Sequence, residues 1–156
     1  MKLCLLVVGE TDDRDLKAAI DRYVTRLGHY CSFNVDVVRS PKKSGKLAAE
    51  ALKVAEGELI LGKLTSRDLL IMLDENGRQF NSVDFAEQLQ KWLNGGHGRI
   101  VFLVGGAFGF SEKVYARADL KLALSAMTLT HQMVRLFFTE QLYRAFTILG
   151  NAKYHH

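Results

Sequence analysis

The stretch Lys2-Leu3-Cys4-Leu5-Leu6-Val7-Val8-Gly9 is almost entirely apolar and ends at a glycine. Such a run is typical of a strand covered on both faces, because a half-exposed strand alternates apolar and polar residues. It superficially resembles the apolar part of a signal peptide. However, it is short, lacks a small-residue cleavage site and leads directly into a polar helix start. We therefore expect it to form a buried first strand.

The rest of the chain alternates between helical and extended patterns. Apolar residues at helical spacing predict helices over 16–27, 47–61, 82–93, 112–117 and 131–149. Apolar runs predict strands over 33–37, 68–73, 100–104 and 121–125, and the residues of 74–77 predict a turn. This order indicates βαβ units, and so an α/β fold with a mostly parallel sheet and helices on both faces. Because there is no internal repeat or linker, residues 1–156 are expected to form a single domain.

Composition narrows the class of protein. The chain has 156 residues, a formal net charge of +4 and two cysteines, Cys4 and Cys31. The charge permits a polyanionic partner without requiring one. No apolar run reaches the roughly 20 residues of a membrane helix, and two cysteines without an export signal indicate a reducing cytoplasm. The histidines and cysteines lack zinc-ligand spacing, so no metal site is expected.

Three predicted strand ends have the character of a ligand site. Ligands of open α/β sheets bind beyond the carboxyl ends of the strands. Here those ends are Leu73-Asp74, Gly105-Gly106 and the loop 124–129, and we expect them to form one cleft. The alternative is that the two glycines only make tight turns. The Gly-x-Gly-x-x-Gly, Walker A and Gly-x-Ser-x-Gly motifs are all missing, which disfavours a dehydrogenase or a hydrolase.

The predicted final helix carries two pairs of polar residues that are each one turn apart. The pair His131 and Arg135 directly follows the expected ligand loop, which favours a functional role. The pair Glu140 and Arg144 has the spacing of an ordinary intrahelical ion pair, and we favour that interpretation.

Several segments together resemble the ribosomal RNA large subunit methyltransferase H family. The specific segments are Val104-Gly105-Gly106, Ser125-Ala126-Met127-Thr128-Leu129, His131-Gln132-Met133-Val134-Arg135 and Glu140-Gln141-Leu142-Tyr143-Arg144-Ala145-Phe146. The start of the chain, the ending Tyr154-His155, the length and the element order fit as well. The resemblance implies a SPOUT α/β fold with a deep trefoil knot near the C-terminus, and an active homodimer. It also implies methylation of N3 of a pseudouridine in 23S ribosomal RNA, with S-adenosylmethionine as methyl donor.

The resemblance also implies which residues form the sites. The expected cofactor positions are Leu73, Gly105, Leu124, Ser125, Ala126, Met127, Thr128 and Leu129. We expect His131, as the acceptor of the N3 proton, and Arg135 to be catalytic. The expected contacts to RNA are Arg135, Arg144, Tyr154, His155, Lys42, Lys43 and Lys46. The ending Tyr154-His155 is expected to close over the nucleotide, in its own subunit or across the dimer.

One departure from the family and two other functional classes stay open. Thr130 stands where the family usually has proline, although threonine can cap the following helix. The fold is also compatible with a non-catalytic RNA-binding module. A third interpretation is a regulator that binds an adenosyl metabolite and has no salt-dependent affinity for RNA.

Overall fold

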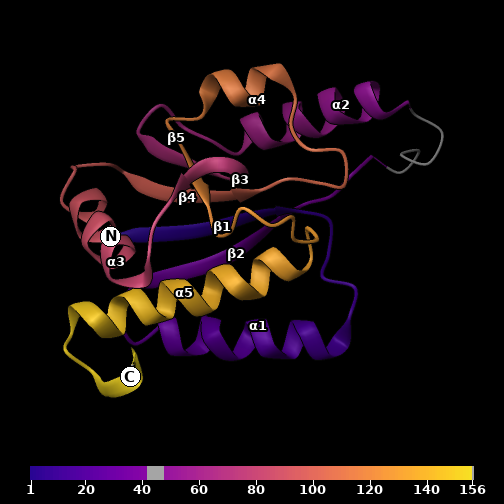
Figure 1. The fold of residues 1–156 in the computed structure, drawn as a ribbon. Helices are drawn as coiled ribbons and strands as arrows, with labels where there is room; N and C mark the ends of the chain where they lie inside the picture. Colours follow the sequence, from indigo (N-terminus) through magenta and orange to yellow (C-terminus); the bar gives the residue numbers. More distant parts are fainter. Residues whose placement is uncertain (42–47, 156) are drawn as a thin grey trace.

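The computed structural model describes residues 1–41 and 48–155, which form a five-stranded sheet between two layers of helices (Figure 1). The elements are β1 (Lys2–Val8), α1 (Arg14–Leu27), β2 (Ser32–Val38), α2 (Ala49–Gly62), β3 (Asp68–Gln79), α3 (Ser82–Leu93), β4 (Arg99–Val104), α4 (Glu112–Arg117), β5 (Leu120–Ala123), α5 (Met133–Leu149) and a 3-10 turn η2 (Lys153–His155). The predicted order of strands and helices is confirmed. No helix in the described part of the chain is long and apolar enough to cross a membrane.

The sheet has the order β2-β1-β4-β3-β5, and every pairing between its strands is parallel. Helices α1, α3 and α5 cover one face, where Leu3 and Leu5 of β1 contribute to the core. Helices α2 and α4 cover the other face, where Cys4 and Leu6 contribute. The apolar run of β1 is therefore buried on both sides, as the sequence predicts. Cys4 is a core residue and, like Cys31, a free thiol.

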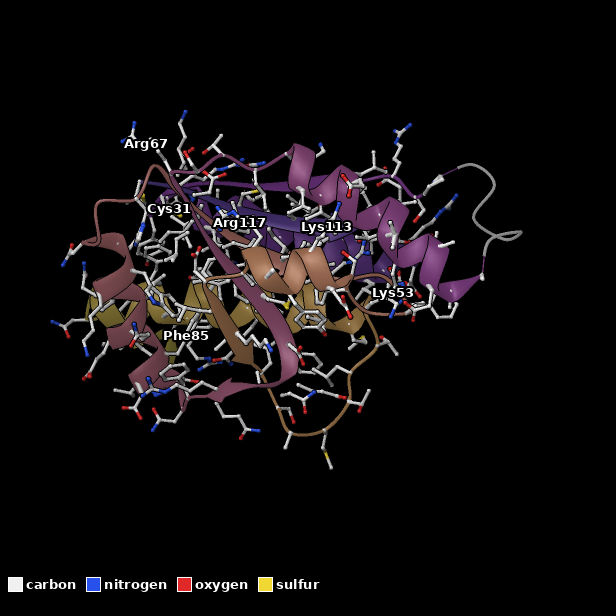
Figure 2. The ribbon with its side chains drawn as sticks, turned by 90° about the horizontal axis from the view of Figure 1, so that it is seen from above. Cys31, Lys53, Arg67, Phe85, Lys113 and Arg117 are labelled. Carbon is white, nitrogen blue, oxygen red and sulfur yellow. The ribbon has the colours of Figure 1, made fainter. Side chains whose placement is uncertain are left out.

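On the face that carries α2 and α4, several basic side chains pair with acidic neighbours. Figure 2 shows Lys53 on α2 and Lys113 and Arg117 on α4 from this side. Lys113 Nζ lies 3.2 Å from a carboxylate oxygen of Glu58, and Arg117 Nη1 lies 3.1 Å from one of Asp119. These pairs partly neutralise the positive charge of α4.

The predicted turn at 74–77 is wrong. Strand β3 continues to Gln79, and both Leu73 and Arg78 pair with Leu122 of β5, so residues 74–77 form a bulge in a strand that then resumes pairing. The turn-forming residues correctly indicate that the chain leaves regular strand pairing at 74–77. Local composition does not show that β3 pairs with β5 again after residue 77. The bulge carries its side chains to the carboxyl edge of the sheet.

The loop between β5 and α5 is longer than the sequence predicts. Strand β5 ends at Ala123, and α5 begins at Met133 rather than at residue 131. Thr130 still satisfies the start of the helix, because its Oγ1 accepts a hydrogen bond from the Met133 amide at 3.1 Å. Asn81 and Ser111 cap α3 and α4, since each accepts a hydrogen bond from an amide of its helix.

The bulge of β3 requires a glycine at position 77. A Cβ there would lie 2.6 Å from the Lys121 carbonyl carbon and 2.7 Å from the Leu122 amide nitrogen, both of which are backbone atoms of β5. We expect Gly77→Ala to lower the free energy of unfolding by roughly 1–3 kcal/mol, as overpacking does, measured by urea denaturation. The control is Gly62→Ala, since nothing lies within 4 Å of its Cβ position. Equal midpoints for the two variants would contradict this account.

Candidate active site

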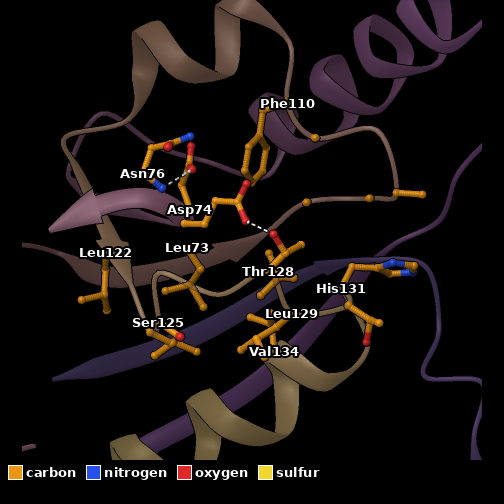
Figure 3. Close-up of a pocket in the computed structure, with 18 of the residues that line it drawn as sticks. Leu73, Asp74, Asn76, Phe110, Leu122, Ser125, Thr128, Leu129, His131 and Val134 are labelled. Carbon is orange, nitrogen blue, oxygen red and sulfur yellow. Dashed lines mark hydrogen bonds between the residues drawn. The ribbon is translucent and has the colours of Figure 1, made fainter. Parts of the chain in front are cut away.

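A cavity of about 590 Å³ lies at the bulge of β3 and beyond the carboxyl ends of β4 and β5 (Figure 3). The structure thus brings together the three strand ends that the sequence singles out. Of the expected cofactor positions, those that line the cavity are Leu73, Gly105, Leu124, Ser125, Met127, Thr128 and Leu129. Ala126 is exposed and is not part of the lining. Figure 3 shows Leu73, Leu129 and Val134 gathered near α5, where they form an apolar wall.

Gly105 and Gly106 are needed because other side chains pack closely against their backbone, and not because the chain makes a tight turn there. Neither has a positive φ, whereas Gly109 in the same loop does. A Cβ on Gly105 would lie 2.9 Å from the ring of Phe110, and a Cβ on Gly106 would lie 2.8 Å from a carboxylate oxygen of Glu56. The missing side chains therefore let these groups pack against the end of β4. This observation answers the alternative that the glycines serve only as turns.

The bulge of β3 forms a polar rim over the cavity that the sequence interpretation missed. Glu75 accepts a hydrogen bond from the Thr128 hydroxyl at 2.7 Å, which joins the bulge to the loop before α5. The Tyr115 hydroxyl donates to Asp74 at 3.3 Å. Burial, together with the charge of Asp74 and the hydrogen bond to it, raises the pKa of Tyr115, so this hydroxyl stays a donor. The cavity therefore has apolar walls, accessible backbone groups and an acidic rim.

Arg135 does not face RNA, and this prediction is corrected. Its side chain is only 1% exposed, and its guanidinium donates to the carbonyl oxygens of Val8 and Gly9 at 2.8 and 2.9 Å and to Thr11 Oγ1 at 3.0 Å. Burial lowers the pKa of Arg135, although the nearby carboxylates of Asp12 and Glu10 oppose the shift. The reason is that the first turn of α5 packs on the end of β1, so this face of the helix is inside.

Gln132 also connects the start of α5 with the segment that follows β1, and its role was not identified from the sequence. Its Oε1 accepts a hydrogen bond from the Asp12 amide, and its Nε2 donates to the Glu10 carbonyl, both at 3.1 Å. Arg135 Nε also donates to the His131 carbonyl at 3.2 Å. His131 is thereby held at the edge of the cavity, where it also lines a second, smaller cavity. Spacing alone shows that residues share a helix face, but not which face meets solvent.

The C-terminal tail packs on its own subunit, away from the cavity. Glu140 and Arg144 form the predicted ion pair at 2.6 Å. The Tyr154 hydroxyl donates to Glu140 at 3.1 Å and lies 3.2 Å from the Tyr23 hydroxyl of α1. The Arg144 guanidinium lies 4.9 Å from the centre of the Tyr154 ring and also contacts His155. Neither Tyr154 nor His155 lines the cavity, whose wall includes Val134 in the first turn of α5. The tail follows the opposite end of this helix (Figure 1).

Two other predictions concern the lysine residues expected to contact RNA and the expectation of no metal site. Lys42, Lys43 and Lys46 lie outside the described residues. Within the described ranges, no three histidine, cysteine, aspartate or glutamate side chains come together as a group that could hold a metal ion.

A family model and several known proteins match this chain over its whole length or nearly so. A family described as predicted SPOUT methyltransferase matches residues 1–155. Proteins named "Ribosomal RNA large subunit methyltransferase H" from Christiangramia forsetii, Flavobacterium johnsoniae and Porphyromonas gingivalis are 51%, 50% and 47% identical, and each match covers 100% of this chain and 99% of the relative. A probable methylase family protein from Haemophilus influenzae has a TM-score of 0.54 at 15% identity, over 97% of this chain and 69% of that one. That likeness shows the fold alone.

The position of Arg135 predicts that its loss destabilises the fold. Arg135→Met keeps much of the aliphatic stem but leaves the buried Val8 and Gly9 carbonyl oxygens without a donor. We expect the free energy of unfolding to fall by roughly 2–4 kcal/mol, measured by urea denaturation. The control is Arg22→Met on the exposed side of α1, which we expect to change it by less than about 0.5 kcal/mol. A wild-type midpoint for Arg135→Met would show that the buried guanidinium is not structural.

Proposed function

Since this chain belongs to the SPOUT methyltransferase family, we propose that it methylates N3 of a pseudouridine in 23S ribosomal RNA, with S-adenosylmethionine as donor. The observation that carries the proposal is the end-to-end match to proteins named for the ribosomal RNA of the large subunit. The cavity at the three strand ends supports it, because open α/β sheets bind their ligands there.

The residues around the cavity fit S-adenosylmethionine. A volume of about 590 Å³ falls in the usual range for pockets of this kind of ligand. Leu73, Leu124 and Leu129 would hold the adenine between apolar surfaces, and the loop 124–129 offers backbone donors and acceptors to its edge. The carboxylates of Asp74 and Glu75 favour a ligand with hydroxyl groups and positive charge. When bound, S-adenosylmethionine supplies an electrophilic methyl group on a sulfonium.

The remaining chemistry falls to the protein's own side chains. His131 is proposed to accept the N3 proton of the base, directly or through one water molecule, because imidazole is the commonest general base among protein side chains and His131 lines the cavity. Arg135 and Gln132 act as positioning residues, since they fix the backbone around His131 to the end of β1. Holding the nitrogen in line with the methyl group supplies much of the rate enhancement in such displacements.

We further propose a homodimer in which the tail of one subunit completes the site of the other. The tail lies on α1 and α5 of its own subunit and does not reach the cavity there. Met133 and Phe137 are one turn apart on α5 and are 36% and 46% exposed, as expected for an apolar face that meets a second subunit. The trefoil knot that the family implies stays a prediction.

The cofactor assignment predicts the effect of a charge in the apolar wall. We expect Leu129→Glu to weaken binding of S-adenosylhomocysteine at least about 10-fold, because a carboxylate would replace a partly buried leucine. Isothermal titration calorimetry measures the affinity, and transfer of a radiolabelled methyl group to ribosomes measures the activity. Leu59→Glu on the exposed surface of α2 is the control. Unchanged affinity in Leu129→Glu would contradict the assignment, and a wild-type protein inactive on ribosomes would contradict the proposed reaction.

The action of the tail across the dimer predicts complementation. The variant that lacks residues 153–156 should be inactive because it has no tail. The variant Leu129→Glu should have little activity when S-adenosylmethionine is limiting, because its cavity is damaged. Mixed dimers would contain one site with an intact cavity and an intact tail from the partner. We expect an equimolar mixture, refolded together, to regain roughly a quarter of the wild-type methyl transfer. No recovery in a mixture shown to contain mixed dimers would assign the tail to its own subunit's site.

A further inference from the structure

A second cavity of about 230 Å³ lies beyond the carboxyl ends of the neighbouring strands β1 and β4. After β1 the chain enters α1 below the sheet, whereas after β4 it enters α4 above the sheet (Figure 1). Two adjacent parallel strands whose connections leave on opposite faces form a crevice, and ligands of open α/β sheets bind at this position. The location therefore favours a binding role independently of the larger cavity.

The two cavities are neighbours that share part of their walls. Gly106, Ala107 and His131 line both of them. A ligand in the smaller cavity would thus face the proposed cofactor site across two small residues and the proposed proton acceptor. Methyl transfer needs the acceptor next to the donor, and the shared wall places the two cavities side by side.

A buried carboxylate lines the smaller cavity. Glu56 of α2 is 6% exposed, and its Oε1 accepts a hydrogen bond from the Ser40 hydroxyl at 3.0 Å. Within the described part of the chain, no basic side chain forms an ion pair with Glu56 and no donor reaches its Oε2. Among the described residues no fully buried side-chain oxygen lacks a hydrogen-bond partner, so Oε2 keeps some accessible surface and can be reached by a ligand. A ligand with an N–H group would satisfy the remaining oxygen.

The rim of this cavity carries an exposed aromatic ring. Phe108, in the loop between β4 and α4, lines the cavity and is 56% exposed. Enzymes that act on a base take it out of the stack, and aromatic side chains hold such bases by stacking. The cavity is less than half the volume of the proposed cofactor site, which suits a single pyrimidine ring better than a second large ligand.

We propose that this cavity receives the target base and that Glu56 Oε2 accepts the N1–H of pseudouridine, a role that rests on the proposed function. Pseudouridine carries N1–H at the ring position where uridine carries C5–H. The carboxylate therefore gains a charged hydrogen bond from pseudouridine and faces a C–H group in uridine. Sites built to bond an N–H group reject an analogue that lacks it, because their own polar group is left unpaired. Glu56 is thus a specificity-determining residue.

The test compares ribosomes that carry pseudouridine or uridine at the target position, the latter from cells without the corresponding pseudouridine synthase. The measurement is kcat/KM for transfer of a radiolabelled methyl group. We expect the wild-type protein to prefer pseudouridine, and Glu56→Gln to reduce that preference by roughly 10- to 100-fold. In Glu56→Gln the side-chain amide oxygen keeps the hydrogen bond from Ser40. The amide nitrogen then takes the place of Oε2, and it cannot accept a hydrogen bond from the N1–H of the base. Affinity for S-adenosylhomocysteine should be unchanged, which separates this role from one in the cofactor site.

Glu58→Gln is the matched control, because Glu58 lies on the same helix, exposed and paired with Lys113. We expect it to keep the wild-type preference. Phe108→Ala, at an exposed position that tolerates truncation, should lower kcat/KM on both substrates about 10-fold through loss of stacking. An unchanged preference in a folded Glu56→Gln would overturn the role of Glu56 while leaving the proposed reaction intact, as would a wild-type protein that methylates both substrates equally. Full activity of Phe108→Ala would overturn the placement of the base, even if Glu56→Gln did not fold.

Discussion

The buried guanidinium of Arg135 connects the start of α5, which carries His131, with the end of β1. It donates to two backbone carbonyl oxygens at the end of β1, and so ties the first turn of α5 to the centre of the sheet. Burying a charge is unfavourable unless hydrogen bonds compensate for it. Here four hydrogen bonds to oxygens of Val8, Gly9, Thr11 and His131 do so. The backbone at His131 is therefore fixed at the wall that both cavities share.

A second constraint acts from the opposite side of the larger cavity. The bulge of β3 places Asp74 and Glu75 at the rim, and the hydrogen bond from Thr128 to Glu75 holds the loop before α5 against it. Gly77 permits this arrangement because β5 runs directly against its backbone. The site is thus built from segments far apart in the sequence, each of which is fixed by contacts with another strand or helix.

Periodicity predicts the helices, the strands and the parallel sheet because each element buries an apolar face of regular spacing. The strand ends are predictable for the same reason, since all parallel strands share one carboxyl edge. Features that depend on long-range contacts are not predictable in this way. The start of α5 faces β1 rather than solvent, which buries Arg135, and β3 resumes pairing after its bulge. Glu56 is part of an ordinary helix in the sequence, and only the approach of Gly106 and Ser40 reveals its burial.

The proposed methyl transfer requires S-adenosylmethionine in the larger cavity and the methyl acceptor beside it. A crystal structure with S-adenosylhomocysteine bound tests this most directly. The account predicts the adenine between Leu73 and the loop 124–129, and the sulfur directed toward Gly106 and His131. A ligand bound away from the three strand ends, or with its sulfur directed away from His131, would contradict it.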